Sequence, residues 1–135
     1  MIELLELSQV LDAVRSTGTE VRYYDERCTS KGVAGFYTFG PNVDRLVICP
    51  SNQLNNSDLF DTVRHEAIHV VQACNGGKPV IAYDDLLENT SEEIKQTVFS
   101  QYPEDHHHHE LEAFTAAEYL SEDDVVKLIN KFCFE

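Results

Sequence analysis

Apolar side chains recur every three or four residues over most of this chain, which is the spacing of one face of an α-helix. Caps and breakers divide the pattern: a Ser-Thr-Gly-Thr run ends the first segment, Gly76-Gly77 ends the second, and Ser121 begins the last. Residues 78–90 are ambiguous, since they fit a short strand as well as a turn. We expect helices at residues 3–16, 57–75, 91–101, 106–120 and 122–133.

Three short segments have the composition of strands, because they are rich in β-branched and aromatic residues and are bounded by turns. They cover residues 21–25, 34–39 and 45–49. A Gly-Pro-Asn turn joins the last two, which predicts an antiparallel hairpin. With 135 residues and no internal repeat, the chain fits a single domain over residues 1–135. We expect an α+β fold in which a small antiparallel sheet of about three strands packs on the helix at 57–75, with further helices around it.

The predicted helix at 57–75 contains the motif His65-Glu66-Ala67-Ile68-His69. Side chains four residues apart share one helix face, so the two imidazoles can converge on a tetrahedral zinc ion. Glu66 can then reach a water on that ion without binding the ion itself. A shuffled chain of this composition gives the pattern in roughly one case in forty. The alternative is therefore an amphipathic helix with two surface histidines, but the capped, uninterrupted helix favours the zinc motif.

A catalytic zinc site has three protein ligands and one open position, so a third ligand must come from elsewhere in the fold. The segment from 110 to 118 offers Glu110, which shares a helix side with the small residues Ala113 and Ala117. Alanines on that side allow two helices to approach closely. Glu112, which shares its side with Ala116, is the alternative third ligand.

These two motifs resemble those of the gluzincins, the HExxH zinc metallopeptidases (zincins) whose third ligand is a glutamate. The order of hairpin, motif helix and glutamate helix is similar to that of the small single-domain gluzincins and the ImmA/IrrE-like peptidases. The resemblance implies a zincin-like fold and one Zn²⁺ bound by His65, His69 and Glu110. It also implies that Glu66 is the general base in hydrolysis of a peptide bond by metal-activated water.

One position departs from this pattern. Many gluzincins have an aspartate four residues after the ligand glutamate, where it orients a zinc-binding histidine, and this chain has Phe114 there. Either another group supplies that contact, or Glu112 is the third ligand.

In gluzincins an edge strand beside the cleft binds the substrate through its backbone. The strand just before the motif helix is the candidate here, and the alternative is an ordinary buried strand. The corresponding substrate-binding residues are Leu46, Val47 and Ile48.

Such enzymes often use a histidine or tyrosine to stabilise the oxyanion, and Tyr102, Tyr119 and the run His106–His109 are all eligible. Consecutive residues on a helix point in different directions, so at most one or two of the four histidines can face one ion. We expect most of the run to be exposed and incidental. His109 is the first choice for a contribution because it adjoins Glu110.

The formal net charge of −14 argues against a nucleic-acid partner, which needs a basic surface, and against docking on anionic membranes. It favours basic substrates through electrostatic steering, although acidity also serves solubility. The N-terminal segment has no basic region followed by an apolar run, and no stretch reaches the length of a membrane span, so a cytoplasmic protein is expected. We accordingly expect reduced cysteines, with a Cys28–Cys49 bridge as the alternative.

The sequence thus predicts a zinc-dependent peptidase, a hydrolase that acts on a peptide or protein substrate. A non-catalytic zinc-binding module with a regulatory or interaction role is the alternative. An acidic interaction protein with a chance motif is a third, less favoured hypothesis.

Overall fold

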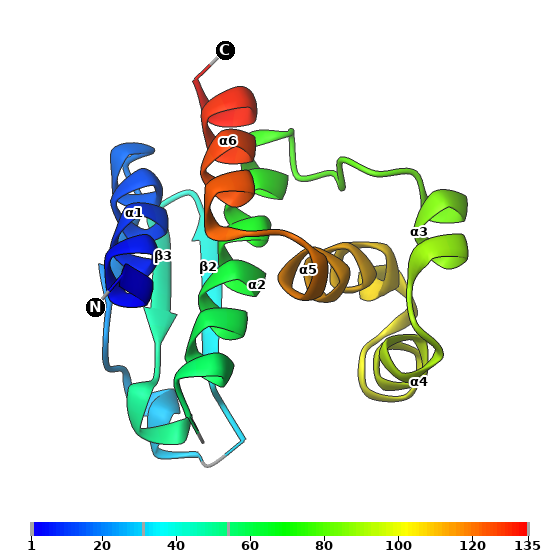
Figure 1. Cartoon of the computed structure of the whole chain (residues 1–135), viewed down its shortest axis with the longest axis horizontal. Helices are drawn as coiled ribbons and strands as arrows, with labels where there is room; N and C mark the ends of the chain where they lie inside the picture. The colour runs from blue at the N-terminus through cyan, green and yellow to red at the C-terminus, as the bar shows by residue number, and fades with distance from the viewer. Residues whose placement is uncertain (1, 31, 54, 135) are drawn as a thin grey trace.

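The computed structural model describes residues 2–30, 32–53 and 55–134, with side chains from Leu7 onward. Helices and strands alternate with short 3-10 turns along the chain (Figure 1). The helices are α1 (Ile2–Ser16), α2 (Asn56–Cys74), α3 (Tyr83–Asn89), α4 (Glu92–Gln101), α5 (His107–Tyr119) and α6 (Glu122–Cys133). The strands are β1 (Glu20–Arg22), β2 (Gly35–Gly40) and β3 (Val43–Ile48), and the 3-10 turns are η1 (Glu26–Thr29), η2 (Pro50–Asn52) and η3 (Glu104–His106).

The five predicted helices are confirmed, with ends that differ by at most one residue, and the ambiguous segment 78–90 contains the short helix α3. Local chemistry sets the ends of α2. The side chain of Asn55 caps the N-terminus of the helix by accepting a hydrogen bond from the backbone N–H of Asp58. At the other end, Gly76 and Gly77 have φ values of 71° and 80°, which favour glycine and stop the helix.

The sheet is mixed rather than antiparallel, so that part of the expected fold is wrong. Its strand order is β1-β3-β2. The predicted hairpin is present, since β2 and β3 pair antiparallel from Gly35↔Ile48 to Gly40↔Val43. After β1 the chain crosses to the opposite edge of the sheet, where it forms β2. The hairpin then places β3 between β2 and β1, and β3 pairs parallel with β1. The coarser α+β class is confirmed.

The main core lies between one face of the sheet and helices α1, α2 and α6. Leu46 and Ile48 of β3 are buried there, whereas Val47 points to the opposite face, toward Cys28 and Phe36. A smaller apolar cluster joins α3, α4 and α5, and Figure 1 shows α3 and α4 on the far side of α5 from the sheet. Helix α5 contributes to both clusters and therefore joins the two parts of the molecule.

The cysteines form two disulfides, so the expectation of reduced thiols is wrong. Cys28 in η1 is bonded to Cys49 after β3, and Cys74 at the end of α2 is bonded to Cys133 in α6. The fold brings the Cα atoms of these pairs to 5.4 and 5.0 Å, the distance that a disulfide requires. The paired cysteines are 21 and 59 residues apart in the sequence, so the sequence alone does not show that they are neighbours. Disulfides persist mainly in oxidising compartments, so this pairing does not favour the expected cytoplasmic location.

In the described residues, every helix is too short or too polar to cross a lipid bilayer.

We predict that both disulfides stabilise the fold by limiting the unfolded chain. Closing loops of these lengths contributes about 3 kcal/mol for Cys28–Cys49 and about 4 kcal/mol for Cys74–Cys133. Paired Cys→Ser variants at each bridge should therefore lower the free energy of unfolding in urea, with the larger loss for Cys74 and Cys133. Free thiols in protein purified without reductant, or unchanged stability of both paired variants, would contradict this prediction.

Candidate metal site and cleft

The two motif histidines lie one turn apart on α2 and face α5. Their ring centroids are 5.1 Å apart, and the side chains of His65 and His69 are only 11% and 17% exposed. Their Nε2 atoms point to the same place, because each lies 3.1 Å from a carboxylate oxygen of the same partner on α5.

That partner is Glu110, in the first turn of α5. One carboxylate oxygen lies 3.1 Å from His65 Nε2, and the other lies 3.1 Å from His69 Nε2. Ala113 and Ala117, predicted to allow close approach of the helices, are buried on the same helix. The structure thus brings together the two histidines and the glutamate that the sequence analysis placed first.

This cluster has the size of a metal site. One ligand atom from each of His65, His69 and Glu110 lies within 4.8 Å of the other two. Ligand atoms on a tetrahedral zinc are about 3.3 Å apart, because Zn–N and Zn–O bonds are about 2.0–2.1 Å long. The observed nitrogen–oxygen separations of 3.1 Å are close to that spacing. Two imidazoles and a carboxylate are also a donor set that suits zinc.

The two shifted pKa values in the cluster indicate that its carboxylates favour a positive charge beside them. Burial alone would lower the pKa of His69, but the bond to Glu110 and the charges of Glu66 and Glu110 raise it to about 9. Burial alone would raise the pKa of Glu110, but the hydrogen bonds from His65 and His69 hold it far below its usual range. A protonated His69 would perform part of the charge compensation that a bound cation would provide.

Glu112, the alternative third ligand, lies elsewhere. It is 3% exposed and binds three donors, none of them a motif histidine. Its Oε1 accepts from Gln72 Nε2 at 3.0 Å, and its Oε2 accepts from the backbone N–H groups of Val80 and Ile81 at 2.8 and 2.6 Å. The geometry therefore favours Glu110 over Glu112 as a ligand.

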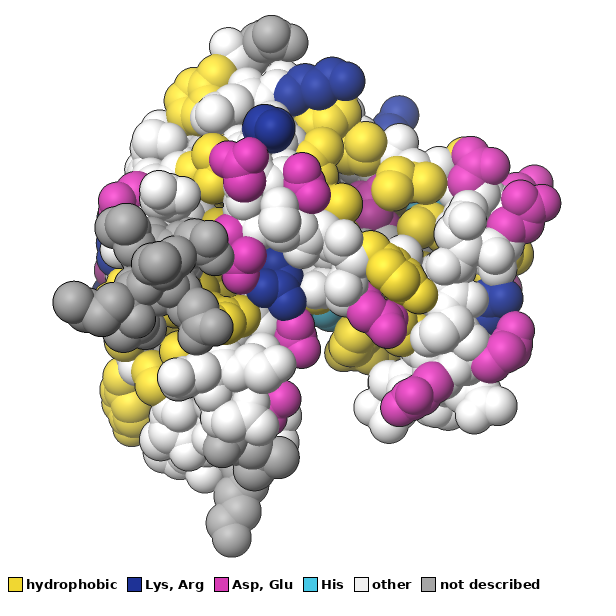
Figure 2. Space-filling model, in the orientation of Figure 1, with side chains coloured by type: hydrophobic (Ala, Val, Ile, Leu, Met, Phe, Trp, Pro, Cys, Tyr) yellow, Lys and Arg dark blue, Asp and Glu magenta, His cyan; other side chains and the backbone are white. Residues whose placement is uncertain are grey.

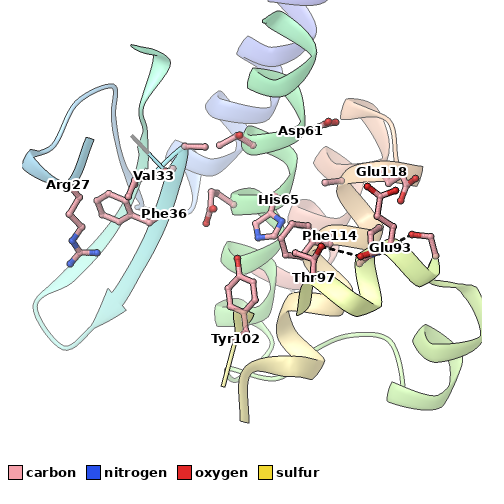
Figure 3. Close-up of a pocket in the computed structure, with 18 residues that line it drawn as sticks. Arg27, Val33, Phe36, Asp61, His65, Glu93, Thr97, Tyr102, Phe114 and Glu118 are labelled. Carbon is pink, nitrogen blue, oxygen red and sulfur yellow. Dashed lines mark hydrogen bonds between the residues drawn. The ribbon is translucent and has the colours of Figure 1, made fainter. Parts of the chain in front are cut away.

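A cleft of about 910 Å³ opens on one side of the cluster. Figure 2 shows the notch between the part that contains the sheet and the part that contains α3 and α4. Figure 3 shows its two walls, with His65 between them on α2. One wall carries Arg27, Val33 and Phe36, and the other carries Glu93, Thr97, Phe114 and Glu118.

Glu66 also lines this cleft. The residue is 8% exposed, and it forms no hydrogen bond or ion pair within the described part of the chain. Buried side-chain oxygen and nitrogen atoms in that part all have hydrogen-bond partners, so the Glu66 carboxylate is in contact with the open space of the cleft. An unpaired carboxylate in the same cleft as His65, one residue along α2, has the position that a general base would need if the cluster held a metal.

Of the predicted oxyanion donors, Tyr102 lines the cleft with His65 and Glu66. Burial, followed by the negative charges of Glu110 and Glu66, raises the pKa of Tyr102 to about 12, which keeps its hydroxyl protonated at neutral pH. Tyr119 is 61% exposed and is not among the described residues that line the cleft.

The histidine run contributes mainly to structure. His107, His108 and His109 each bond a backbone carbonyl through Nε2, on Tyr102, Ile81 and Gly77 respectively. A second cavity of about 460 Å³ lies on the other side of the cluster. It is lined by Tyr37, Phe39, His69, Gln72, Ala73, Gly77, His106, His109 and Glu110.

The expectation that Leu46–Ile48 form an open edge is wrong. β3 is the central strand, with neighbours on both sides, and these three residues are at most 1% exposed. The edge strand at the cleft is β2, whose residues Gly35 and Phe36 line it. The hairpin order alone did not reveal which of the two strands would be central.

Sequence reasoning also missed the role of Gln72, which bonds His69 Nδ1 through Oε1 at 2.7 Å. Its position three residues after His69 on one helix face was the available signal. Phe114, which occupies the position of the missing aspartate, packs its ring edge-to-face on His65 with centroids 4.4 Å apart.

We predict that purified protein binds about one zinc per chain through this cluster. Replacing His65, His69 or Glu110 by Ala should each weaken zinc binding by more than the roughly 10–100-fold that loss of an outer partner causes. The control is Glu88→Ala, which removes an exposed carboxylate on α3, away from the cluster. Elemental analysis after dialysis measures the bound metal. Equal zinc in the cluster variants and the control would contradict the prediction.

Comparison with known proteins yields one family-model match, to a domain of unknown function (DUF8637), over residues 2–134. No curated protein and no solved structure is significantly similar to the chain. Because the family model covers nearly the whole sequence, the chain belongs to the DUF8637 family.

Proposed function

We propose that this protein is a zinc-dependent peptidase of gluzincin type. The observation that carries the proposal is the convergence of His65, His69 and Glu110 at one point, beside the unpaired carboxylate of Glu66 in an open cleft. Zinc bound by the three ligands would polarise a substrate carbonyl and lower the pKa of a coordinated water toward about 7.

The residues around the cluster have complementary tasks. Glu66 accepts a proton from the attacking water and passes it to the leaving amine, which requires a carboxylate within reach but not bound elsewhere. Tyr102 keeps its hydroxyl proton at neutral pH and faces the same cleft. It donates a hydrogen bond to the negative charge that develops on the carbonyl oxygen.

Strand β2 is the proposed substrate platform, in place of β3. The Ala34 carbonyl accepts from the Cys49 N–H, so Ala34 faces β3. Because hydrogen bonding alternates along an antiparallel pair, the backbone groups of Gly35, Tyr37 and Phe39 point to the open edge. An extended peptide can add to this edge as a further strand. Gly35 lines the first cavity, whereas Tyr37 and Phe39 line the second, so such a peptide would pass the metal cluster between them.

Gly35 keeps this strand close to the motif helix. A Cβ at this position would lie 2.9 Å from both the Thr62 side chain and the Val47 carbonyl, which is closer than real contacts allow. Any larger residue would push β2 away from α2 and widen the cleft beside His65.

The charge of the cleft indicates the substrate class. Four of the described lining residues are acidic, Asp61, Glu66, Glu93 and Glu118, and one, Arg27, is basic. Arg27 lies over the Phe36 ring at 4.4 Å. The chain as a whole has a net charge of −14, so the electrostatic potential around the protein and the charge of the cleft are both negative. Peptides with lysine or arginine near the cleaved bond are the proposed substrates.

Glu66→Gln should retain zinc and lose hydrolysis. An amide of the same shape cannot accept the proton, which should lower kcat roughly 100-fold or more. Glu88→Gln, on the exposed face of α3, is the matched control and should have wild-type activity. Fluorogenic peptide-library assays with parallel zinc analysis measure both properties. Stoichiometric zinc without hydrolysis in the wild type would instead support the non-catalytic zinc-binding module.

Substrate preference is tested separately with peptides of one length that carry either lysine or glutamate at the flanking positions. At low salt the lysine peptides should have kcat/KM roughly 10-fold higher, and the ratio should fall as salt screens the cleft. The double variant Glu93→Gln with Glu118→Gln should reduce the ratio at constant zinc content. Equal kcat/KM for both peptide classes would contradict the proposed substrate class but not the peptidase itself.

A further inference from the structure

Gln72 on α2 uses its whole side-chain amide. Its Oε1 lies 2.7 Å from His69 Nδ1, and its Nε2 donates to the His109 carbonyl and to Glu112 Oε1, both at 3.0 Å. An amide nitrogen has two N–H donors, so both are used. The residue is 3% exposed, which excludes compensation by bulk water.

This arrangement fixes which way the amide points. If the amide were flipped, its oxygen would face two acceptors, the Glu112 carboxylate and the His109 carbonyl, and its nitrogen would face His69. Two buried oxygen–oxygen contacts replacing two hydrogen bonds make the flipped amide strongly unfavourable. Glu112 and the His109 carbonyl therefore set the oxygen of Gln72 against the histidine.

The orientation of Gln72 determines the state of His69. An amide oxygen only accepts hydrogen bonds, so Nδ1 of His69 must carry the hydrogen. The other ring nitrogen, Nε2, is then the one available as a ligand, and it is the atom that lies 3.1 Å from Glu110. A wrong tautomer or a rotated ring would turn an N–H toward the metal position.

Glu112 is itself held by the backbone. Besides Gln72, it accepts from the N–H groups of Val80 and Ile81, and these three donors require the acceptor capacity of a carboxylate. The same segment is fixed by His108 and His109, which bond the carbonyls of Ile81 and Gly77. The chain of contacts thus runs from rigid backbone to the candidate metal ligand.

We propose that Glu112 and Gln72 form a positioning relay that holds His69 with Nδ1 protonated and Nε2 directed at the metal. The relay rests on the proposed function in that it treats His69 as a zinc ligand. It assigns a task to Glu112 that is distinct from ligation. It also supplies the orienting contact that Phe114 cannot provide, and it does so at His69.

The test uses the single variants Glu112→Gln and Gln72→Glu and the double variant that combines them. Each single variant places two like groups against each other. Glu112→Gln leaves two amides with too few acceptors, and Gln72→Glu leaves two carboxylates. The double variant restores a carboxylate acceptor against His69 and an amide donor between positions 72 and 112, but it leaves a carboxylate oxygen facing the His109 carbonyl. Zinc affinity should fall roughly 10–100-fold in each single variant and recover in part in the double variant.

A second readout follows the ring itself. Protein labelled with ¹⁵N-histidine and loaded with zinc should show a His69 Nδ1–H that exchanges slowly with solvent in the wild type and the double variant. The signal should be lost or exchange rapidly in the single variants. Because a general loss of packing would not be reversed by exchanging the two groups, recovery in the double variant separates positioning from structural support.

Gln72→Met provides a variant that leaves the bonds of Glu112 to Val80 and Ile81 in place, in case the charged variants do not fold. It should have weaker zinc binding and faster Nδ1–H exchange. Unchanged affinity and exchange in Gln72→Met or in folded Glu112→Gln would overturn the relay alone. Zinc binding without peptide hydrolysis would overturn the peptidase and leave the relay, whereas a wild-type protein with no zinc affinity would overturn both.

Discussion

The carboxylate of Glu110 between two imidazoles is the interaction on which the rest of the molecule depends. A buried carboxylate is costly unless cationic or donor groups surround it, and His65 and His69 supply them at 3.1 Å each. This requirement fixes how α5 crosses α2. Alanines on α5 allow the close approach. Arg64, next to His65, secures the crossing further along α5 by bonding the Ala117 carbonyl, and it also bonds Glu122 at the start of α6.

The cleft follows from the way α2 is shared by two parts of the fold. The sheet with η1 forms one wall, α4 and α5 form the other, and α2 carries the motif between them. The disulfides tie the first part together, since one holds η1 against the end of β3 and the other holds α2 against α6. Two walls that face each other, one of them carrying an open edge strand, suit the proposed binding of an extended chain.

Local patterns were sufficient to predict much of this arrangement. Helical periodicity and caps gave the five longer helices, and the spacing of Glu110 from Ala113 and Ala117 selected the glutamate that meets the histidines. Non-local features were not accessible in this way. The central position of β3, the parallel β1 and the pairing of Cys74 with Cys133 depend on how distant segments pack, and the sequence carries no periodic signal for that. The bonds of Glu112 belong to the same class, because its partners lie 31 to 40 residues away.

The most direct test of the central claim is a crystal structure of the zinc-loaded protein with anomalous data at the zinc edge. Such data locate the ion independently of any assumed ligand. We predict one zinc bound by Nε2 of His65, Nε2 of His69 and the Glu110 carboxylate, with the remaining position open toward the cleft and Glu66 beside it. Zinc bound by Glu112, a fourth protein ligand that closes the site, or no zinc between α2 and α5 would contradict the account.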